Sequence, residues 1–212
     1  MSKTSLVALI LGAGPKVGLP AAKAFASKGY KVAIAARSLN EVDSTNNQLN
    51  IKSDFANPDD VVKAFAKVKK ELGIPSVVIY NAGAATFAPP GDPFAISLDA
   101  FQRDMTVNNT SVFVAAQQAV LGFAELPADA PRAFFFTGNI LNVTPLPQFL
   151  ESGAGKFYYV DQRKPDGSAA FKIDGDAHSQ LFLELVEAKT QGPWLQTFVK
   201  GTGYQDFGPY RL

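Results

Sequence analysis

A glycine-rich turn near the N-terminus has the residue types needed to bind a phosphate group. The turn spans 12–18 and follows a continuous apolar stretch, 6–11, of the kind that forms a strand buried on both faces. Glycines let the backbone turn sharply and approach a pyrophosphate, and a helix that begins after the turn offers free N–H groups to the anion. We expect the ligand contacts at Gly12, Gly14, Pro15, Lys16, Val17 and Gly18. The alternative is a turn that only packs a helix against a strand.

The residues after the second apolar stretch, 30–35, bear on which nucleotide would bind. A site for NAD places an Asp or Glu near the end of the second strand, where it accepts a hydrogen bond from the ribose 2′-OH. Here Arg37 and Ser38 follow that strand, and Lys16 could add a second cation. A guanidinium and a hydroxyl suit a 2′-phosphate, so the sequence favours NADP(H). If both cations are solvated surface residues, the preference stays open.

The elements that must position these residues alternate between strands and helices. We expect strands at 6–11, 30–35, 48–52, 76–80 and 132–136, and helices at 19–28, 59–72 and 98–123. This order predicts an α/β fold in three layers, a doubly wound parallel sheet with helices on both faces. A sixth strand at 157–161, a helix at 176–189 and a last strand at 195–199 follow. The length predicts a single domain over residues 1–212.

The order of four short motifs resembles that of the short-chain dehydrogenase/reductase family. The first motif of that family is GxxxGxG, and Gly12 and Gly18 occupy its outer positions, with Lys16 where the middle glycine is expected. The other matches are Asp54-Phe55 after the third strand, Asn81-Ala82-Gly83 after the fourth strand, and Val107-Asn108 within the long helix. The resemblance implies a Rossmann-type fold and a nicotinamide cofactor contacted by Asp54, Phe55, Asn81, Ala82 and Gly83. It also implies that Asn108 kinks its helix.

The catalytic residues of that family are only partly matched. The family uses a Tyr as proton donor, with a Lys four residues later on the same helical face. None of the six tyrosines here has a Lys at that spacing. The nearest match places Ser152 at the Tyr position before Lys156, with Asn139 where a substrate-orienting Ser is expected. The resemblance therefore implies Asn108, Asn139, Ser152 and Lys156 as catalytic candidates. The alternative for Lys156 is a surface residue, and a Ser hydroxyl is far less acidic than a phenol.

The crossover between the fifth and sixth expected strands is short. Its 20 residues, 137–156, can connect the strands but cannot hold both the catalytic loop and the full helix of the family. Either the helix was lost or a stretch was deleted near Gly155. Two functions therefore stay open. The first is an NADP(H)-dependent oxidoreductase acting on a carbonyl or an alcohol. The second is a pseudoenzyme that binds NADP(H) as a sensor or scaffold without hydride transfer.

Composition limits the partners. A net charge of +1 gives no reason to expect nucleic acid or an anionic membrane, and the lack of Cys and the single His argue against a metal site. No apolar run is long enough to span a bilayer, and we expect a cytoplasmic protein with a small-molecule substrate. The loops 84–93 and 141–150 are apolar, which fits a hydrophobic substrate, a lid or a partner surface. The sequence leaves a homo-oligomer open.

Overall fold

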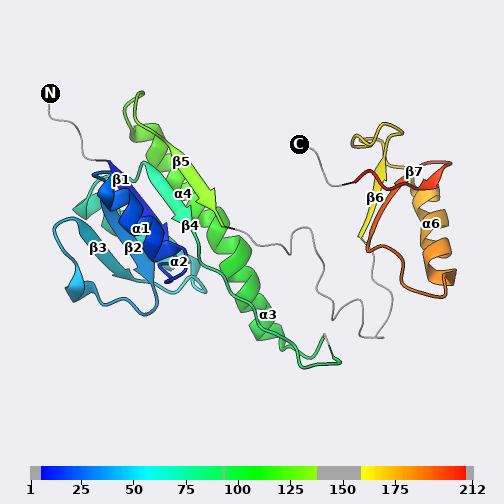
Figure 1. Ribbon diagram of the computed structural model, residues 1–212, viewed down its shortest axis with the longest axis horizontal. Coiled ribbons are helices and arrows are strands. Elements are labelled where there is room, and N and C mark those ends of the chain that lie inside the picture. The colour runs from blue at the N-terminus through cyan, green and yellow to red at the C-terminus, as the bar shows by residue number, and fades with distance from the viewer. Residues whose placement is uncertain (1–5, 93, 138–158, 209–212) are drawn as a thin grey trace. The chain divides into compact units, whose positions relative to one another are not determined.

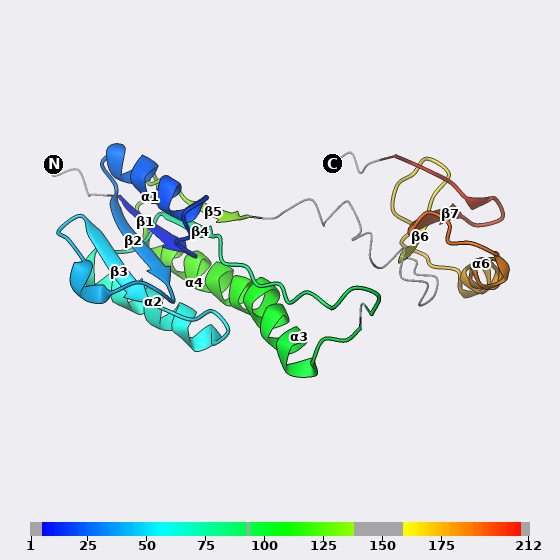
Figure 2. The ribbon, with the colours of Figure 1, turned by 60° about the horizontal axis from the view of Figure 1, so that its bottom comes forward.

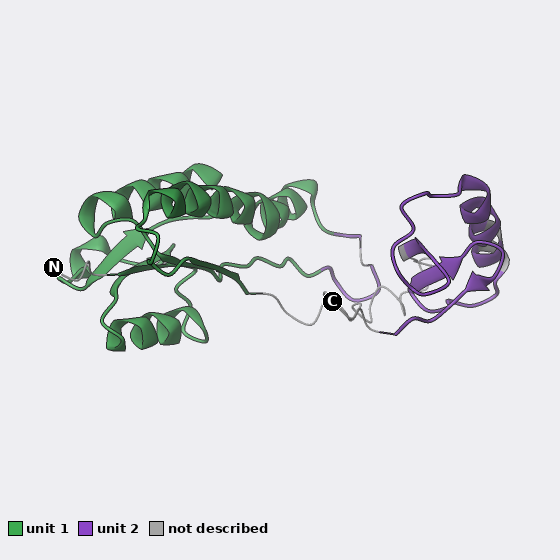
Figure 3. Cartoon of the chain, turned by 90° about the horizontal axis from the view of Figure 1, so that it is seen from above, with its two compact units in different colours: residues 1–87, 96–139 green, residues 88–95, 140–212 purple. Residues whose placement is uncertain are grey.

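The computed structural model describes residues 6–92, 94–137 and 159–208, and the chain divides into two compact units (Figures 1 and 3). The first unit comprises residues 1–87 and 96–139, and the second comprises residues 88–95 and 140–212. Each unit contains its own β-sheet. The single domain expected over residues 1–212 stays a prediction. Among the described residues, no helix combines the length and apolar character needed to cross a membrane.

The sheet of the first unit has five parallel strands in the order β3-β2-β1-β4-β5. The strands are β1 (Val7–Leu11), β2 (Lys31–Ala36), β3 (Gln48–Lys52), β4 (Val77–Tyr80) and β5 (Ala133–Phe136). A short 3-10 turn, η1 (Glu41–Asp43), precedes β3. The chain moves outward from β1 to β3 and then returns to place β4 on the other side of β1. This arrangement confirms the predicted doubly wound α/β fold.

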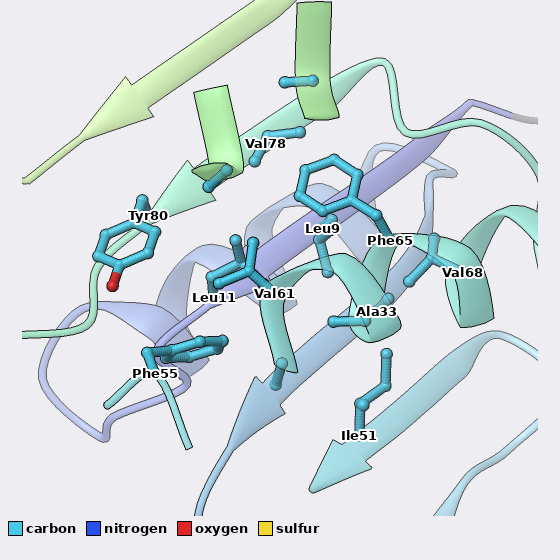
Figure 4. Packing of buried hydrophobic residues seen from close by; sticks show 14 of the residues in the cluster. Leu9, Leu11, Ala33, Ile51, Phe55, Val61, Phe65, Val68, Val78 and Tyr80 are labelled. Atoms are coloured by element: carbon cyan, nitrogen blue, oxygen red, sulfur yellow. The ribbon is translucent and has the colours of Figure 1, made fainter. Parts of the chain in front are cut away.

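Helices cover both faces of this sheet. Helix α1 (Gly18–Ser27) packs on one face, and α2 (Pro58–Glu71) and α4 (Ser111–Glu125) pack on the other (Figure 2). Alternate residues of β1 point to opposite faces, so Leu9 and Leu11 pack with α2 and α4 while Ile10 packs on the α1 side. Figure 4 shows the buried hydrophobic residues on the α2 and α4 side of the sheet, to which α2 contributes Val61 and Phe65. Burying each such side chain stabilises the fold by roughly 1.5–3 kcal/mol.

The long helix expected at 98–123 changes geometry at its middle. It begins as α3 (Leu98–Met105), passes through a π-helical turn, η2 (Thr106–Thr110), and continues as α4. The buried Tyr80 hydroxyl donates to the Val107 carbonyl oxygen inside the π turn, at 2.6 Å. A π turn widens the helix by one residue, and such turns occur often at functional sites.

The second unit contains a smaller sheet in the order β6-β7-β8. Strands β6 (Tyr159–Arg163) and β7 (Leu195–Val199) are parallel, with α6 (Gly175–Glu187) between them in sequence, and β8 (Gly203–Tyr204) runs antiparallel to β7. The sequence located β6, α6 and β7 to within about two residues, the usual uncertainty at element ends. It did not predict β8, which follows the strand expected to be the last. Strands β6 and β7, which correspond to the sixth and last strands expected from the sequence, pair with each other in this second sheet. Apart from Thr137, the predicted short crossover lies outside the described residues.

Candidate functional site

The first unit has an open cleft of about 760 Å³ at the carboxyl ends of its strands. Loops that directly follow β1, β2, β3 and β4 line it, and α3 and the π turn add Arg103 and Val107. The cleft lies where the strand order reverses between β1 and β4, which is where open α/β sheets bind their ligands. It brings together ten of the predicted cofactor residues: Gly12, Gly14, Pro15, Arg37, Ser38, Asp54, Phe55, Asn81, Ala82 and Gly83.

The three glycines of the first turn differ in the space around them. Gly12 has a φ of 101°, and a Cβ added there would lie 2.3 Å from the Ala82 backbone nitrogen. A Cβ on Gly18 would lie 2.3 Å from the Gly12 carbonyl oxygen. Gly14 instead has no atom of the described residues within 4 Å of its Cβ position. Gly12 and Gly18 therefore let the turn pack tightly, whereas Gly14 leaves open space beside the cleft.

Helix α1 starts directly after this turn, and its N-terminus differs from those of three other helices of the chain in how it is capped. In the described part of the chain its N-cap, Val17, makes no side-chain hydrogen bond to the first turn. By contrast, the side chains of Asn57, Ser97 and Asp174 cap α2, α3 and α6. The Leu19 N–H already donates to the Gly14 carbonyl at 3.0 Å, the Ala21 N–H donates to the Val17 carbonyl at 2.9 Å, and Pro20 has no N–H. In this first turn of the described helix, the Gly18 N–H is therefore the donor left for an anion. Lys16 and Val17 are exposed and Gly18 is buried, and these three predicted residues are not among the described residues lining the cleft.

The loop after β4 is tied to the glycine turn by backbone and side-chain contacts. The N–H groups of Asn81 and Ala82 both donate to the Leu11 carbonyl, and the Asn81 side-chain amide donates to the Gly12 carbonyl at 2.8 Å. The Thr137 hydroxyl donates to Asn81 Oδ1 at 2.9 Å, which fixes the orientation of that amide. These bonds place the Asn81-Ala82-Gly83 backbone along the cleft.

The loop after β3 is held from α2 and α4. The Asp54 N–H donates to Asp60 Oδ2 at 3.1 Å, and the Ser111 hydroxyl donates to the Phe55 carbonyl at 2.7 Å. The N–H of Asp54 and the Lys63 ammonium lower the pKa of the Asp60 carboxyl, against the opposing effect of burial. The Phe55 ring is 5% exposed and packs in the core, so this residue mainly positions the loop beside Asp54.

The loop after β2 presents Arg37 and Ser38 both to the cleft and to an adjoining hollow of about 670 Å³. The carboxylate in that hollow, Glu41, is already engaged. It pairs with the Lys67 ammonium at 2.7 Å and accepts a hydrogen bond from the Lys52 N–H, and its pKa is lowered chiefly by the bond from Lys67. Among the described residues lining the hollow, Arg37 and Lys52 are cations, so it suits an added negative charge.

Asn108 lies in the π turn and holds the loop after β4. Its Oδ1 accepts a hydrogen bond from the Ala84 N–H at 3.0 Å, and its Nδ2 donates to the Ala84 carbonyl at 2.7 Å. Asn108 therefore lies where the helix changes from α to π geometry, and the kink implied at this residue stays a prediction. The other three catalytic candidates, Asn139, Ser152 and Lys156, lie outside the described residues.

Sequence reasoning missed Ser53 and Arg103, which both line the cleft. Ser53 directly follows β3, so the rule that ligands bind at the carboxyl ends of strands could have found it. Arg103 lies on α3, three residues before the π turn begins, and nothing in the sequence indicated that this part of the helix reaches the cleft.

Comparisons with known proteins agree on one family. The family described as "short chain dehydrogenase" matches residues 6–144. A "Short chain dehydrogenase/reductase dmxR12" from Cryptosporiopsis sp. is 39% identical over 237 aligned positions, which cover 96% of each chain. The "3-beta-hydroxysteroid dehydrogenase" of Comamonas testosteroni is 30% identical over 151 residues, covering 68% of this chain and 54% of the relative. This chain thus spans about half the length of the second relative.

Solved structures show the same fold. A 3-ketoacyl-(acyl-carrier-protein) reductase from Brucella melitensis, solved in complex with NADH, superposes with a TM-score of 0.60 at 18% identity, covering 94% of this chain and 99% of that one. The alignment with the Cryptosporiopsis protein has 237 positions against 212 residues here, so at least 25 positions (237 − 212) have no counterpart in this chain. The loss of a helix or of a stretch near Gly155 stays a prediction.

Proposed function

Because the chain belongs to the short-chain dehydrogenase/reductase family, we propose that it is an NADP(H)-dependent oxidoreductase that interconverts a carbonyl and an alcohol. The observation that carries the proposal is the cleft of the first unit, which collects predicted residues from four separate loops. The open space at Gly14 and the uncapped N-terminus of α1 together fit a pyrophosphate. When bound, the nicotinamide supplies or accepts the hydride.

The chain's own residues bind and orient in this proposal. The turn at Gly14 and the Gly18 N–H at the start of α1 are proposed to bind the phosphates, and the cleft-lining Asp54 is proposed to contact the adenosine. Asn108 binds both the N–H and the carbonyl of Ala84, and thereby keeps the wall of the cleft in place. Ser152 and Lys156 are proposed as proton donor and ribose-binding residue, with Asn139 orienting the substrate.

The preference for NADP(H) rests on Arg37 and Ser38. Both line the cleft and the adjoining hollow, where Glu41 is engaged by Lys67 and so does not offer a free carboxylate to a ribose hydroxyl. A guanidinium forms strong charge-assisted hydrogen bonds to a phosphate. Lys16 is exposed and stands apart from the cleft lining in the described residues, so we assign it at most a secondary part in binding the 2′-phosphate.

Thermal unfolding with added nucleotide tests the cofactor. NADPH at ~100 times its Kd should stabilise the protein by ~2.7 kcal/mol, and NADH should do so only at higher concentration. The Arg37→Ala variant should bind NADPH ~10-fold more weakly and NADH unchanged, because it loses a charged hydrogen bond to the 2′-phosphate. Lys23→Ala on the exposed side of α1 is the charge-matched control. An equal loss of affinity for both nucleotides would contradict the assignment of Arg37.

Turnover tests the chemistry. We expect substrate-dependent loss of NADPH absorbance with at least one member of a carbonyl panel, and lower turnover in Ser152→Ala and Lys156→Ala. Unchanged turnover in both variants would remove them as catalytic residues while leaving the oxidoreductase in place. NADPH binding without turnover on any member would instead support the alternative, a nucleotide-binding protein without hydride transfer.

We further propose an apolar substrate. Phe87 follows the cleft-lining loop after β4 and is 73% exposed, and one relative is named for a steroid, which is an apolar ring system. The panel should therefore pair cyclic apolar ketones with small polar ketones of similar reactivity. A lower KM for the polar ketones would contradict this choice.

A further inference from the structure

Three side chains at the end of α3 and in the π turn hold the loop that follows β4. Asn108 contacts Ala84, as described above, and Asp104 and Arg103 contact Thr86 two residues later. Asp104 and Asn108 are four residues apart, so they meet the same stretch of loop from one side of the helix. Ala84 and Ala85 line the cleft, so these contacts fix a part of its wall.

The contacts around Thr86 form a closed network. Asp104 Oδ2 accepts the hydrogen bond from the Thr86 N–H, and Asp104 Oδ1 accepts from the Arg103 guanidinium at 3.0 Å. The same Arg103 Nη2 donates to the Thr86 hydroxyl at 3.1 Å, which joins the three residues in a ring. The Asp104 side chain is 15% exposed while that of Arg103 is 53% exposed. The carboxylate is thus the sheltered centre of the network, and Arg103 is the member that lines the cleft.

We propose that Asp104 is a positioning residue for the nucleotide cleft, holding both the loop at Thr86 and the guanidinium of Arg103 in place. This inference rests on the proposed function, because it assigns a role toward the same cofactor. Asn108 holds Ala84, and the contacts at Thr86 hold the loop on the other side of the cleft-lining Ala85. The charge matters because an amide at this position could accept from the Thr86 N–H but would turn N–H groups toward the donors of Arg103.

The test measures NADPH binding to the full chain. The change in nucleotide fluorescence reports binding, at a temperature well below that of unfolding. We expect Asp104→Ala to raise the NADPH Kd about tenfold, because it loses two charged contacts. Asp104→Asn should lie between it and wild type, since it keeps one acceptor for Thr86. Asp99→Ala is the matched control, an exposed acid in the first turn of the same helix. Its Kd should stay within about twofold of wild type.

Binding stoichiometry separates positioning from stability. A residue that only stabilises the fold would lower the fraction of protein that binds but leave the Kd unchanged, and that result would overturn the inference. So would a Kd for Asp104→Ala equal to that of Asp99→Ala. If Asp104→Ala does not fold, Asp104→Asn decides, and a wild-type Kd in it overturns the role of the charge. Wild-type protein that binds neither NADPH nor NADH would refute the proposed function itself, and this inference with it.

Discussion

At the scale of single residues, the first glycine turn separates a packing requirement from a binding requirement. Gly12 has positive φ and no room for a Cβ, whereas Gly14 has open space beside the cleft. We expect Gly12→Ala to destabilise the fold by roughly 2 kcal/mol or more, because backbone would have to move. We expect Gly14→Ala to leave stability unchanged or raised by about 0.4–1 kcal/mol, yet to weaken NADPH binding. Urea unfolding and nucleotide titration measure the two effects.

The contrast between the two glycine variants is the informative part. If Gly14→Ala bound NADPH as tightly as wild type, the open space at this turn would not be where the pyrophosphate lies. If Gly12→Ala were as stable as wild type, its close approach to Ala82 would be less tight than the structure shows.

Tyr80 offers a second prediction at this scale. Its buried hydroxyl donates to the Val107 carbonyl in the π turn, and burial raises the pKa of Tyr80 to about 12. Tyr80→Phe should cost about 1–3 kcal/mol, because it leaves a carbonyl without its donor. Since the folded pKa lies above the unfolded value of about 10, the wild-type advantage is complete below pH 10 and is lost as the pH rises towards 12. Urea midpoints of both proteins between pH 7 and 11 test this, and an advantage that persists undiminished at pH 11 would contradict it.

At the scale of elements, Arg132 closes the end of α4. Its guanidinium donates to the carbonyls of Phe123, Leu126 and Pro127 at 2.9–3.0 Å, where a helix has unsatisfied acceptors. We expect Arg132→Ala to lower the free energy of unfolding by roughly 1–2 kcal/mol. Arg132→Lys should recover only part of this, since an ammonium lacks the planar fork. Urea unfolding measures both, and two variants of equal stability would show that the fork geometry is unimportant.

The sequence predicted elements better than contacts between them. The strands at 48–52 and 195–199 were located at their observed bounds, because apolar periodicity and turn residues are local signals. The hydrogen bond between Thr86 and Asp104 joins residues 18 apart in the sequence, and the one between Tyr80 and Val107 joins residues 27 apart. Such contacts depend on how α3 and the π turn lie over the sheet, which no local pattern encodes. For the same reason, the sequence did not predict that Arg103 lines the cleft.

The cofactor loops were predictable because each directly follows a strand. The glycine turn, Arg37, Asp54 and Asn81 all lie at carboxyl ends of parallel strands, so recognising the strands placed them together. Local sequence did not show that the Phe55 side chain packs in the core, or that Glu41 forms a salt bridge with Lys67.

At the scale of the whole molecule, carboxylates with lowered pKa values make stability depend on pH, and three of them lie in the first unit. The pKa values of Glu41, Asp60 and Asp104 are lowered, in the first two chiefly by a hydrogen bond from Lys67 and from the Asp54 N–H. At Asp104, burial raises the pKa but the bonds from Thr86 and Arg103 outweigh it. A lowered folded pKa gives stability that is present above the unfolded value of about 4 and lost as the pH falls through the folded pKa.

We therefore expect the unfolding temperature to fall as the pH drops from 5 to 3. Because these carboxylates hold loops around the cleft, NADPH affinity should fall over the same range. Asp60→Asn should show a smaller drop than wild type, since it removes one of the linked groups, and Asp59→Asn in the same helical turn is the control. An unfolding temperature that is constant down to pH 3 would contradict the linkage.

The N-terminus of α1, which lacks a side-chain cap in the described chain, affects local opening of the first unit. Where Asn57 and Ser97 complete the first turns of their helices, Val17 leaves that of α1 without a side-chain partner in the described chain. A bound phosphate would then serve as the missing cap. The Gly18 amide hydrogen at the start of α1 should exchange quickly in the free protein and slowly when nucleotide is bound, whereas the Leu19 N–H already donates to the Gly14 carbonyl in the free protein. Nucleotide binding would thus raise the free energy of local opening at the first turn of α1.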